Sequence, residues 1–81
     1  MTKYAVYQYG YAVWGTGATE DAAIEDAIAN GAEFDASEIS NDQVYGEMVM
    51  IQITDELCDY IDIHGGDVGI ERGEDGIYTL A

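Results

Sequence analysis

Proline is absent from this chain, and basic residues are nearly so: Lys3 and Arg72 stand against 17 acidic residues, for a formal net charge of −15 in 81 residues. This shortage excludes nucleic-acid binding, because affinity for DNA or RNA depends on neutralising several phosphates with lysine or arginine. The same charge repels anionic membranes, but it attracts basic proteins and raises their association rates. The composition therefore predicts a partner protein with a positively charged surface.

Cysteine is also scarce, since Cys58 is the only one and no intrachain disulfide can form. Without a base beside it, this thiol is predicted to be a core residue and not a nucleophile. No stretch approaches the roughly 20 apolar residues of a membrane span, and no charged segment precedes a short apolar run as in a signal peptide. We therefore expect a cytoplasmic protein, in the host cytoplasm if a phage encodes it.

Motifs of enzyme chemistry are missing. His64 is the only histidine, and no serine, cysteine or second histidine is spaced to work with it. The segment Gly15-Thr16-Gly17 lacks the third glycine and the lysine of a phosphate-binding loop. No EF-hand pattern occurs, and two acidic pairs would attract a cation only weakly: Asp67 with Glu71, and Glu74 with Asp75. We expect neither an enzyme nor a cofactor or metal site.

The hydrophobic share, 48%, is normal for a globular protein, and the length allows one domain over residues 1–81. Residues 3–14 are rich in β-branched and aromatic side chains, which predicts one long strand or a tight hairpin that bends at Gly10. Period-two alternation places Tyr7, Tyr9, Tyr11 and Val13 on one face. Further strands are predicted at 45–53, 68–72 and 77–80, the last two joined by a glycine-rich turn.

Two helices are predicted, at 19–30 and 55–64. Each begins with a threonine and two acidic residues, which suit the N-cap and the helix dipole, and each ends at glycine. Their apolar stripes are Ala23, Ile24, Ala27 and Ile28 in the first, and Leu57, Tyr60, Ile61 and His64 in the second. The order β-α-β-α-β-β favours an α+β domain: a mostly antiparallel sheet with both helices on one face. Residues 32–43 are predicted to be a loop with at most a short helical turn.

The acidic residues fall on the polar faces of both predicted helices. Helical neighbours four residues apart lie about 6 Å from each other, so a row of carboxylates approximates a row of phosphates that a basic DNA groove would accept. Ordinary exposed helices mix charges of both signs, so a single sign indicates a function. The expected partner-binding residues are Glu20, Asp21, Glu25, Asp26, Asp55, Glu56, Asp59 and Asp62.

The capped acidic segments TEDAAIEDAIANG and TDELCDYIDIHGG, together with the small size and the charge, resemble small inhibitors of phages and other mobile elements. These include anti-CRISPR and DNA-mimic proteins. The resemblance implies a non-catalytic inhibitor that occupies a DNA-binding or PAM-reading surface of a host CRISPR effector complex. There, arginine and lysine would pair with the carboxylates.

Two other interpretations stay open. The protein could be an acidic inhibitor or antitoxin that caps a different basic protein, or a housekeeping domain of a salt-adapted organism, which its single lysine would suit. The seven tyrosines are either core residues or interface anchors. If helices cover only one side of the sheet, some of these rings face a partner or a second copy of the chain.

Overall fold

The tyrosine-rich segment near the N-terminus is a hairpin. In the computed structural model, which describes residues 2–39 and 44–81, strand β1 (Lys3–Gln8) pairs antiparallel with β2 (Ala12–Gly17). The chain turns at Gly10, whose positive φ of 83° suits glycine. The pairing shifts after Val6, so that Trp14 is the extra residue of a β-bulge. Of the two predictions for this segment, the hairpin is confirmed.

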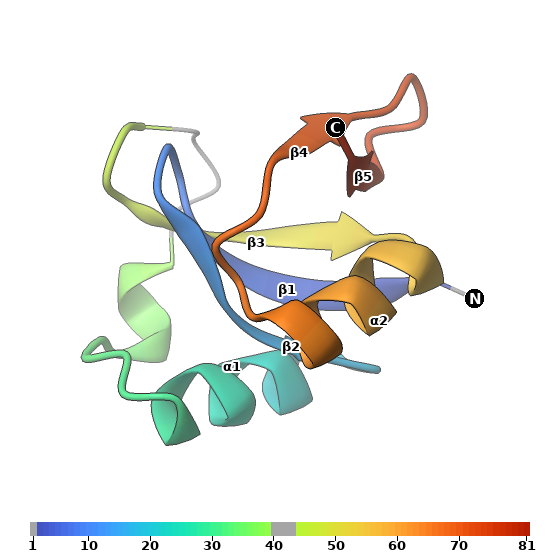
Figure 1. Cartoon of the computed structure of the whole chain (residues 1–81). Helices are drawn as coiled ribbons and strands as arrows, with labels where there is room; N and C mark the ends of the chain where they lie inside the picture. The colour runs from blue at the N-terminus through green and yellow to red at the C-terminus, as the bar shows by residue number, and fades with distance from the viewer. Residues whose placement is uncertain (1, 40–43) are drawn as a thin grey trace.

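The sheet has five strands in the order β2-β1-β3-β5-β4 (Figure 1), with β3 at Met48–Ile53, β4 at Ile70–Arg72 and β5 at Tyr78–Leu80. Three of its pairings are antiparallel, and only β3 with β5 is parallel. The prediction of an α+β domain with a mostly antiparallel sheet is confirmed. The predicted loop holds one short 3-10 helix, η1 (Ala36–Glu38), while its residues 40–43 lie outside the described part of the chain.

The two helices begin where the sequence predicts. Helix α1 (Glu20–Ala29) follows Thr19, whose hydroxyl accepts a hydrogen bond of 3.1 Å from the Ala22 N–H. Helix α2 (Asp55–His64) follows Thr54, whose hydroxyl accepts a bond of the same length from Leu57. Capping is local chemistry between residues three apart in the chain, and for this reason the sequence alone located both helices.

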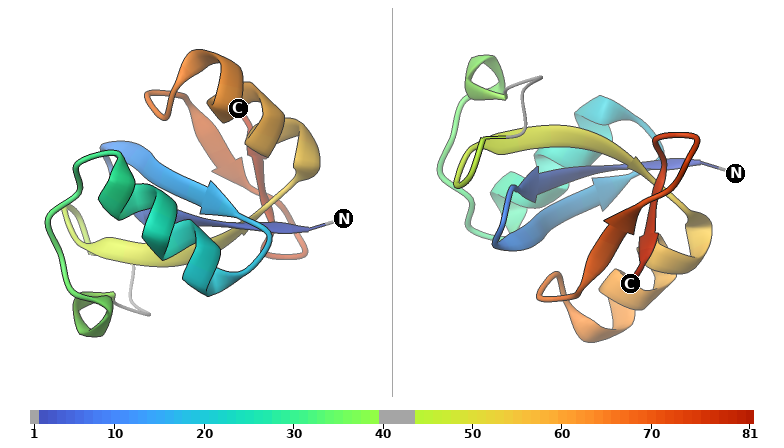
Figure 2. Two further views of the ribbon diagram at one scale, coloured as in Figure 1. Left: turned by 90° about the horizontal axis from the view of Figure 1, so that it is seen from below. Right: turned by 90° about the horizontal axis from the view of Figure 1, so that it is seen from above.

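The helices lie on opposite faces of the sheet, so the prediction that they share one face is wrong. Figure 2 shows α1 in front when the sheet is seen from below, whereas the β4–β5 hairpin is in front and α1 lies behind when it is seen from above. Helix α2 packs on a different hydrophobic cluster from α1, the one that also contains Tyr78 of β5. The cause lies in the interior strand β1, where the neighbours Ala5 and Val6 are both fully buried. Adjacent strand residues point to opposite faces, so both faces need a cover.

Each face has its own hydrophobic cluster. Val6, Ala23, Ala27 and Ala32 form the cluster under α1. The cluster under α2 is larger and contains Ala5, Val13, Val49, Ile51, Ile53, Leu57, Cys58, Ile61 and Tyr78. Cys58 is therefore a core residue, as predicted, and burial raises the pKa of its thiol, although a hydrogen bond with Thr16 acts in the opposite direction.

Both predicted helix stripes need correction. Ile28, expected in the stripe of α1, is 52% exposed, and Tyr60, expected in that of α2, is 38% exposed. Tyr60 stacks instead on the exposed His64, with 4.4 Å between the ring centroids. The buried residues of α2 are Leu57, Cys58 and Ile61. The periodicity of a helix is compatible with more than one apolar stripe, and packing against the sheet decides which residues are buried.

No helix within residues 2–39 and 44–81 is long and apolar enough to cross a membrane.

Candidate functional site

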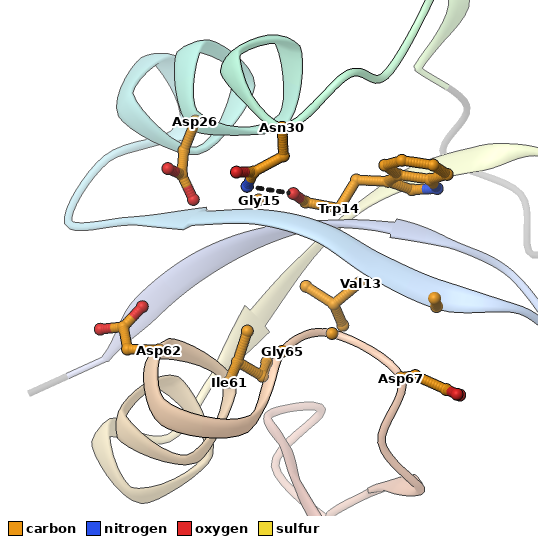
Figure 3. A pocket seen from close by; sticks show the side chains of 11 residues that line it. Val13, Trp14, Gly15, Asp26, Asn30, Ile61, Asp62, Gly65 and Asp67 are labelled. Atoms are coloured by element: carbon orange, nitrogen blue, oxygen red, sulfur yellow. Dashed lines mark hydrogen bonds between the residues drawn. The ribbon is translucent and has the colours of Figure 1, made fainter.

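A groove of about 500 Å³ runs along the outer edge of β2, between α1 and α2 (Figure 3). One wall comes from α1, and the other comes from α2 and the loop that follows it. Ala12, Val13, Trp14, Gly15, Asp26, Asn30, Ile61, Asp62, Gly65, Gly66 and Asp67 line the groove. It is the place where both acidic helices reach the same strand.

Hydrogen bonds to the backbone of β2 hold the walls of the groove in place. From α1, the Asp26 carboxylate accepts a bond of 3.0 Å from the Thr16 N–H, and the Asn30 side-chain amide donates one of 2.8 Å to the Trp14 carbonyl. From the loop after α2, the Gly66 carbonyl accepts a bond of 3.0 Å from the Val13 N–H. A Cβ at Gly66 would overlap the Val13 carbonyl oxygen, so glycine alone allows the loop to lie this close.

Three carboxylates from three segments line the groove, Asp26 and Asp62 toward one end and Asp67 at the other, and no lysine or arginine lines it. Thr16 joins two of them, because its N–H donates to Asp26 of α1 and its hydroxyl donates to Asp62 of α2 over 3.5 Å. Asp67, on the loop after α2, is exposed at the same groove. Val13 and Ile61 add apolar lining. Such a hollow suits a cation on an aliphatic stem, as in arginine or lysine.

The eight acids predicted from the sequence do not form one flat surface, because their helices lie on opposite faces. On α1, Glu20, Asp21 and Glu25 are exposed, whereas Asp26 is half-buried and bonded to β2. On α2, Glu56, Asp59 and Asp62 are exposed, and Asp55 is half-buried in the first turn. Asp26 and Asp62 are the members of the set that line the groove.

Sequence reasoning missed the groove itself. Asp67 was considered only as half of a weak cation-binding pair, and nothing local in the sequence placed it in one groove with Asp26 and Asp62. The one available signal was the double glycine before Asp67, which indicates a backbone that approaches another segment closely.

Among the residues described, no group of three or more histidine, cysteine, aspartate or glutamate side chains is placed to hold a metal ion. No protein-family model, curated protein or solved structure matches this chain. The groove, the exposed acids and the net charge are therefore the basis for a functional proposal.

Proposed function

We propose that this protein is a stoichiometric inhibitor that binds the basic nucleic-acid-binding surface of another protein in place of DNA, in the manner of anti-CRISPR DNA mimics. The observation that carries the proposal is the exposure of six acids, three on each helix, in a folded chain with only two basic residues. Keeping so many like charges on one small domain costs folding stability, and a basic partner would offset that cost.

The distribution of the acids favours a channel over a flat patch as the target surface. Exposed carboxylates lie on two opposite faces of the sheet, and Asp67 adds an exposed one at the β2 edge between them. A nucleic-acid channel surrounds its ligand with positive charge, and CRISPR effector complexes hold their guide–target duplex in such a channel. The Cα trace of the domain spans only 27 × 24 × 20 Å. Effector complexes are therefore the first target class to test.

The groove supplies a specific contact within this general attraction. An arginine or lysine of the channel would place its stem along Val13 and Ile61 and its charged end near Asp62, at the end of the groove where Asp26 also lies. Planar guanidinium groups pair with carboxylates through two parallel hydrogen bonds, which favours arginine. Asp26 would contribute charge while it continues to hold β2.

The alternative favoured by a specific observation is a salt-adapted domain without an inhibitory role, because the chain has a single lysine. Such a domain would lose structure at low salt, where its acids repel one another over a longer distance. An inhibitor of a cytoplasmic complex must stay folded at physiological salt. Far-UV circular dichroism across a salt series separates the two.

The decisive experiment measures binding of the labelled protein to purified, immobilised CRISPR effector complexes of several types. We expect retention at about 0.15 M salt, weakening at about 0.5 M salt as charges are screened. Target DNA should displace the protein, because both would occupy one channel. Retention that target DNA does not affect would mean a basic partner surface outside the channel.

A pair of charge-matched variants locates the contact. We expect Glu25→Gln with Asp62→Asn to weaken binding about tenfold or more. Glu71→Gln with Glu74→Gln removes the same charge from exposed positions on and beside β4, and it should change binding far less. Equal losses would show that net charge alone drives binding. If no complex retains the protein and it folds only at high salt, the salt-adapted alternative is correct.

A further inference from the structure

Two tyrosine rings stand exposed beside the end of the groove where β2 begins. Tyr11 is 56% exposed and directly precedes Ala12, the first groove residue, while Tyr45, on the loop before β3, is 67% exposed. Their ring centroids are 5.0 Å apart, and the ring planes are inclined at 47°. We call Tyr11 and Tyr45 the tyrosine pair.

Backbone hydrogen bonds join the two segments that carry the tyrosine pair. The Tyr9 N–H donates a bond of 2.9 Å to the Glu47 carbonyl, and the Gly46 N–H donates one of 2.8 Å to the Tyr9 carbonyl, which joins the hairpin turn to the loop. Gly10 lies beneath the Tyr45 ring, where a Cβ would overlap the ring carbons. Interaction with Tyr11 also raises the pKa of the Tyr45 phenol. These contacts place the two rings side by side.

Core packing does not account for these two rings, because both are largely outside the hydrophobic clusters. Exposed aromatic side chains on a fixed backbone lose little entropy on binding, and for this reason tyrosine is a frequent interface anchor. The environment selects the partner group. The net charge of −15 and the exposed Glu47 beside Tyr45 attract a cation, and the face of an aromatic ring is itself negative.

We propose that the tyrosine pair is a contact for an arginine side chain of the basic partner, whose guanidinium stacks on the ring faces. The proposal rests on the proposed function in that it requires a basic partner. Arginine is favoured over lysine because its planar guanidinium stacks on rings and is less strongly hydrated than an ammonium group. Together with the adjacent acidic groove, the tyrosine pair would form a surface that distinguishes arginine from lysine, whereas the carboxylates alone attract any cation.

The experiment needs no identified partner. The aromatic ring resonances of the whole protein are followed by NMR during titration with tetra-arginine, tetra-lysine and tetra-citrulline peptides. Citrulline keeps the planar shape of arginine without its charge. We expect the arginine peptide to shift the Tyr11 and Tyr45 ring signals most, the lysine peptide to shift them less, and the citrulline peptide to leave them nearly unchanged.

Variants then test the rings directly. Tyr45→Leu should lower affinity for the arginine peptide about two- to fivefold, the range expected for an exposed cation–π contact. Tyr45→Phe keeps the ring and should retain the affinity, which also guards against a folding defect in the leucine variant. Tyr60→Leu is the matched control, because Tyr60 is an exposed tyrosine on α2, away from the pair.

Three results would overturn the proposal. These are that the arginine peptide shifts only backbone signals of α1 and α2, that the citrulline peptide shifts the ring signals as much as the arginine peptide does, or that none of the peptides binds. Each would show that the tyrosine pair is not an arginine contact. Binding to effector complexes is a separate measurement. The proposed function can therefore hold when the arginine contact fails, and the arginine contact can hold for another basic partner when no effector complex binds.

Discussion

Helices α1 and α2 are each 10 residues long and begin with the same threonine cap, yet they pack on the sheet by opposite means. Helix α1 presents alanines, Ala23 and Ala27, and lies so close to β2 that a Cβ at Gly15 would be 2.6 Å from the Ala27 Cα. Helix α2 presents Leu57, Cys58 and Ile61, and these side chains fill the space between the helix and the sheet.

This difference shows that shared capping chemistry does not determine how a helix packs. Backbone contact at α1 leaves no room for an added atom, whereas the cluster under α2 depends on the volume of its side chains. The first interface should therefore fail when a side chain grows, and the second when a side chain shrinks.

The largest effect is expected from Gly15→Ala. The new methyl group would meet the backbone of α1, which cannot move without leaving β2, so we expect a loss of more than about 3 kcal/mol, a large part of the stability of a small domain. Urea unfolding followed by circular dichroism measures it. Gly69→Ala is the control, because its Cβ would make an ordinary contact of 3.6 Å with the Ala81 Cβ. A loss below about 1 kcal/mol would mean that α1 lies further from β2.

Leu57→Ala tests the α2 side of the comparison. Leu57 is fully buried, and truncation would leave a cavity, so we expect the unfolding free energy to fall by about 3 kcal/mol. The same urea titration applies. Ile63→Ala on the same helix serves as control, since Ile63 is 76% exposed and its truncation should cost less than about 0.5 kcal/mol. Equal costs for the two variants would contradict the packing described for α2.

The caps are the feature that the helices share, and they should give equal effects. Thr19→Ala and Thr54→Ala each remove one hydrogen bond of 3.1 Å to an N-terminal N–H, so each should cost about 1 kcal/mol. Thr19→Ser and Thr54→Ser keep the hydroxyl and should restore most of the stability. A much larger loss at Thr54 would show that α2 depends on its cap more than α1 does.

The smallest expected effect is a gain. Glu25 on α1 lies one turn from Asp21, and Asp59 on α2 lies one turn from Asp55, so each pair places like charges together. Glu25→Gln and Asp59→Asn should each raise the unfolding free energy by about 0.3 kcal/mol at low salt. The gain should shrink as salt screens the repulsion. A gain that is independent of salt would point to a cause other than charge.

The sequence predicted what depends on neighbouring residues. Thr19, Thr54 and the glycines after each helix marked both helices within a residue or two, since caps and turns are decided locally. The shared face was predicted from the element order as the economical arrangement, and it is wrong because Ala5 and Val6, neighbours on β1, belong to separate buried clusters, so that each face of the sheet needs a cover.

The candidate site was predicted in part. The exposed acids of each helix follow from helical spacing, but the groove depends on β2 lying at the edge of the sheet between the helices. Asp26, Asp62 and Asp67 come from three segments that no local pattern connects. The tyrosine pair has the same origin, because Tyr11 and Tyr45 meet only when the hairpin turn pairs with the loop before β3.

The side chain of Asn30, the carboxylate of Asp26 and the loop at Gly66 occupy backbone groups on the outer side of β2. An open strand edge is a template on which another chain can add a strand, and it is a common starting point for aggregation. On the outer side of β2 these backbone groups already have hydrogen-bond partners, and the opposite edge strand, β4, is only three residues long. The protein is thereby protected against strand-to-strand association at high concentration, and a partner that approaches the groove must recognise side chains and not extend the sheet.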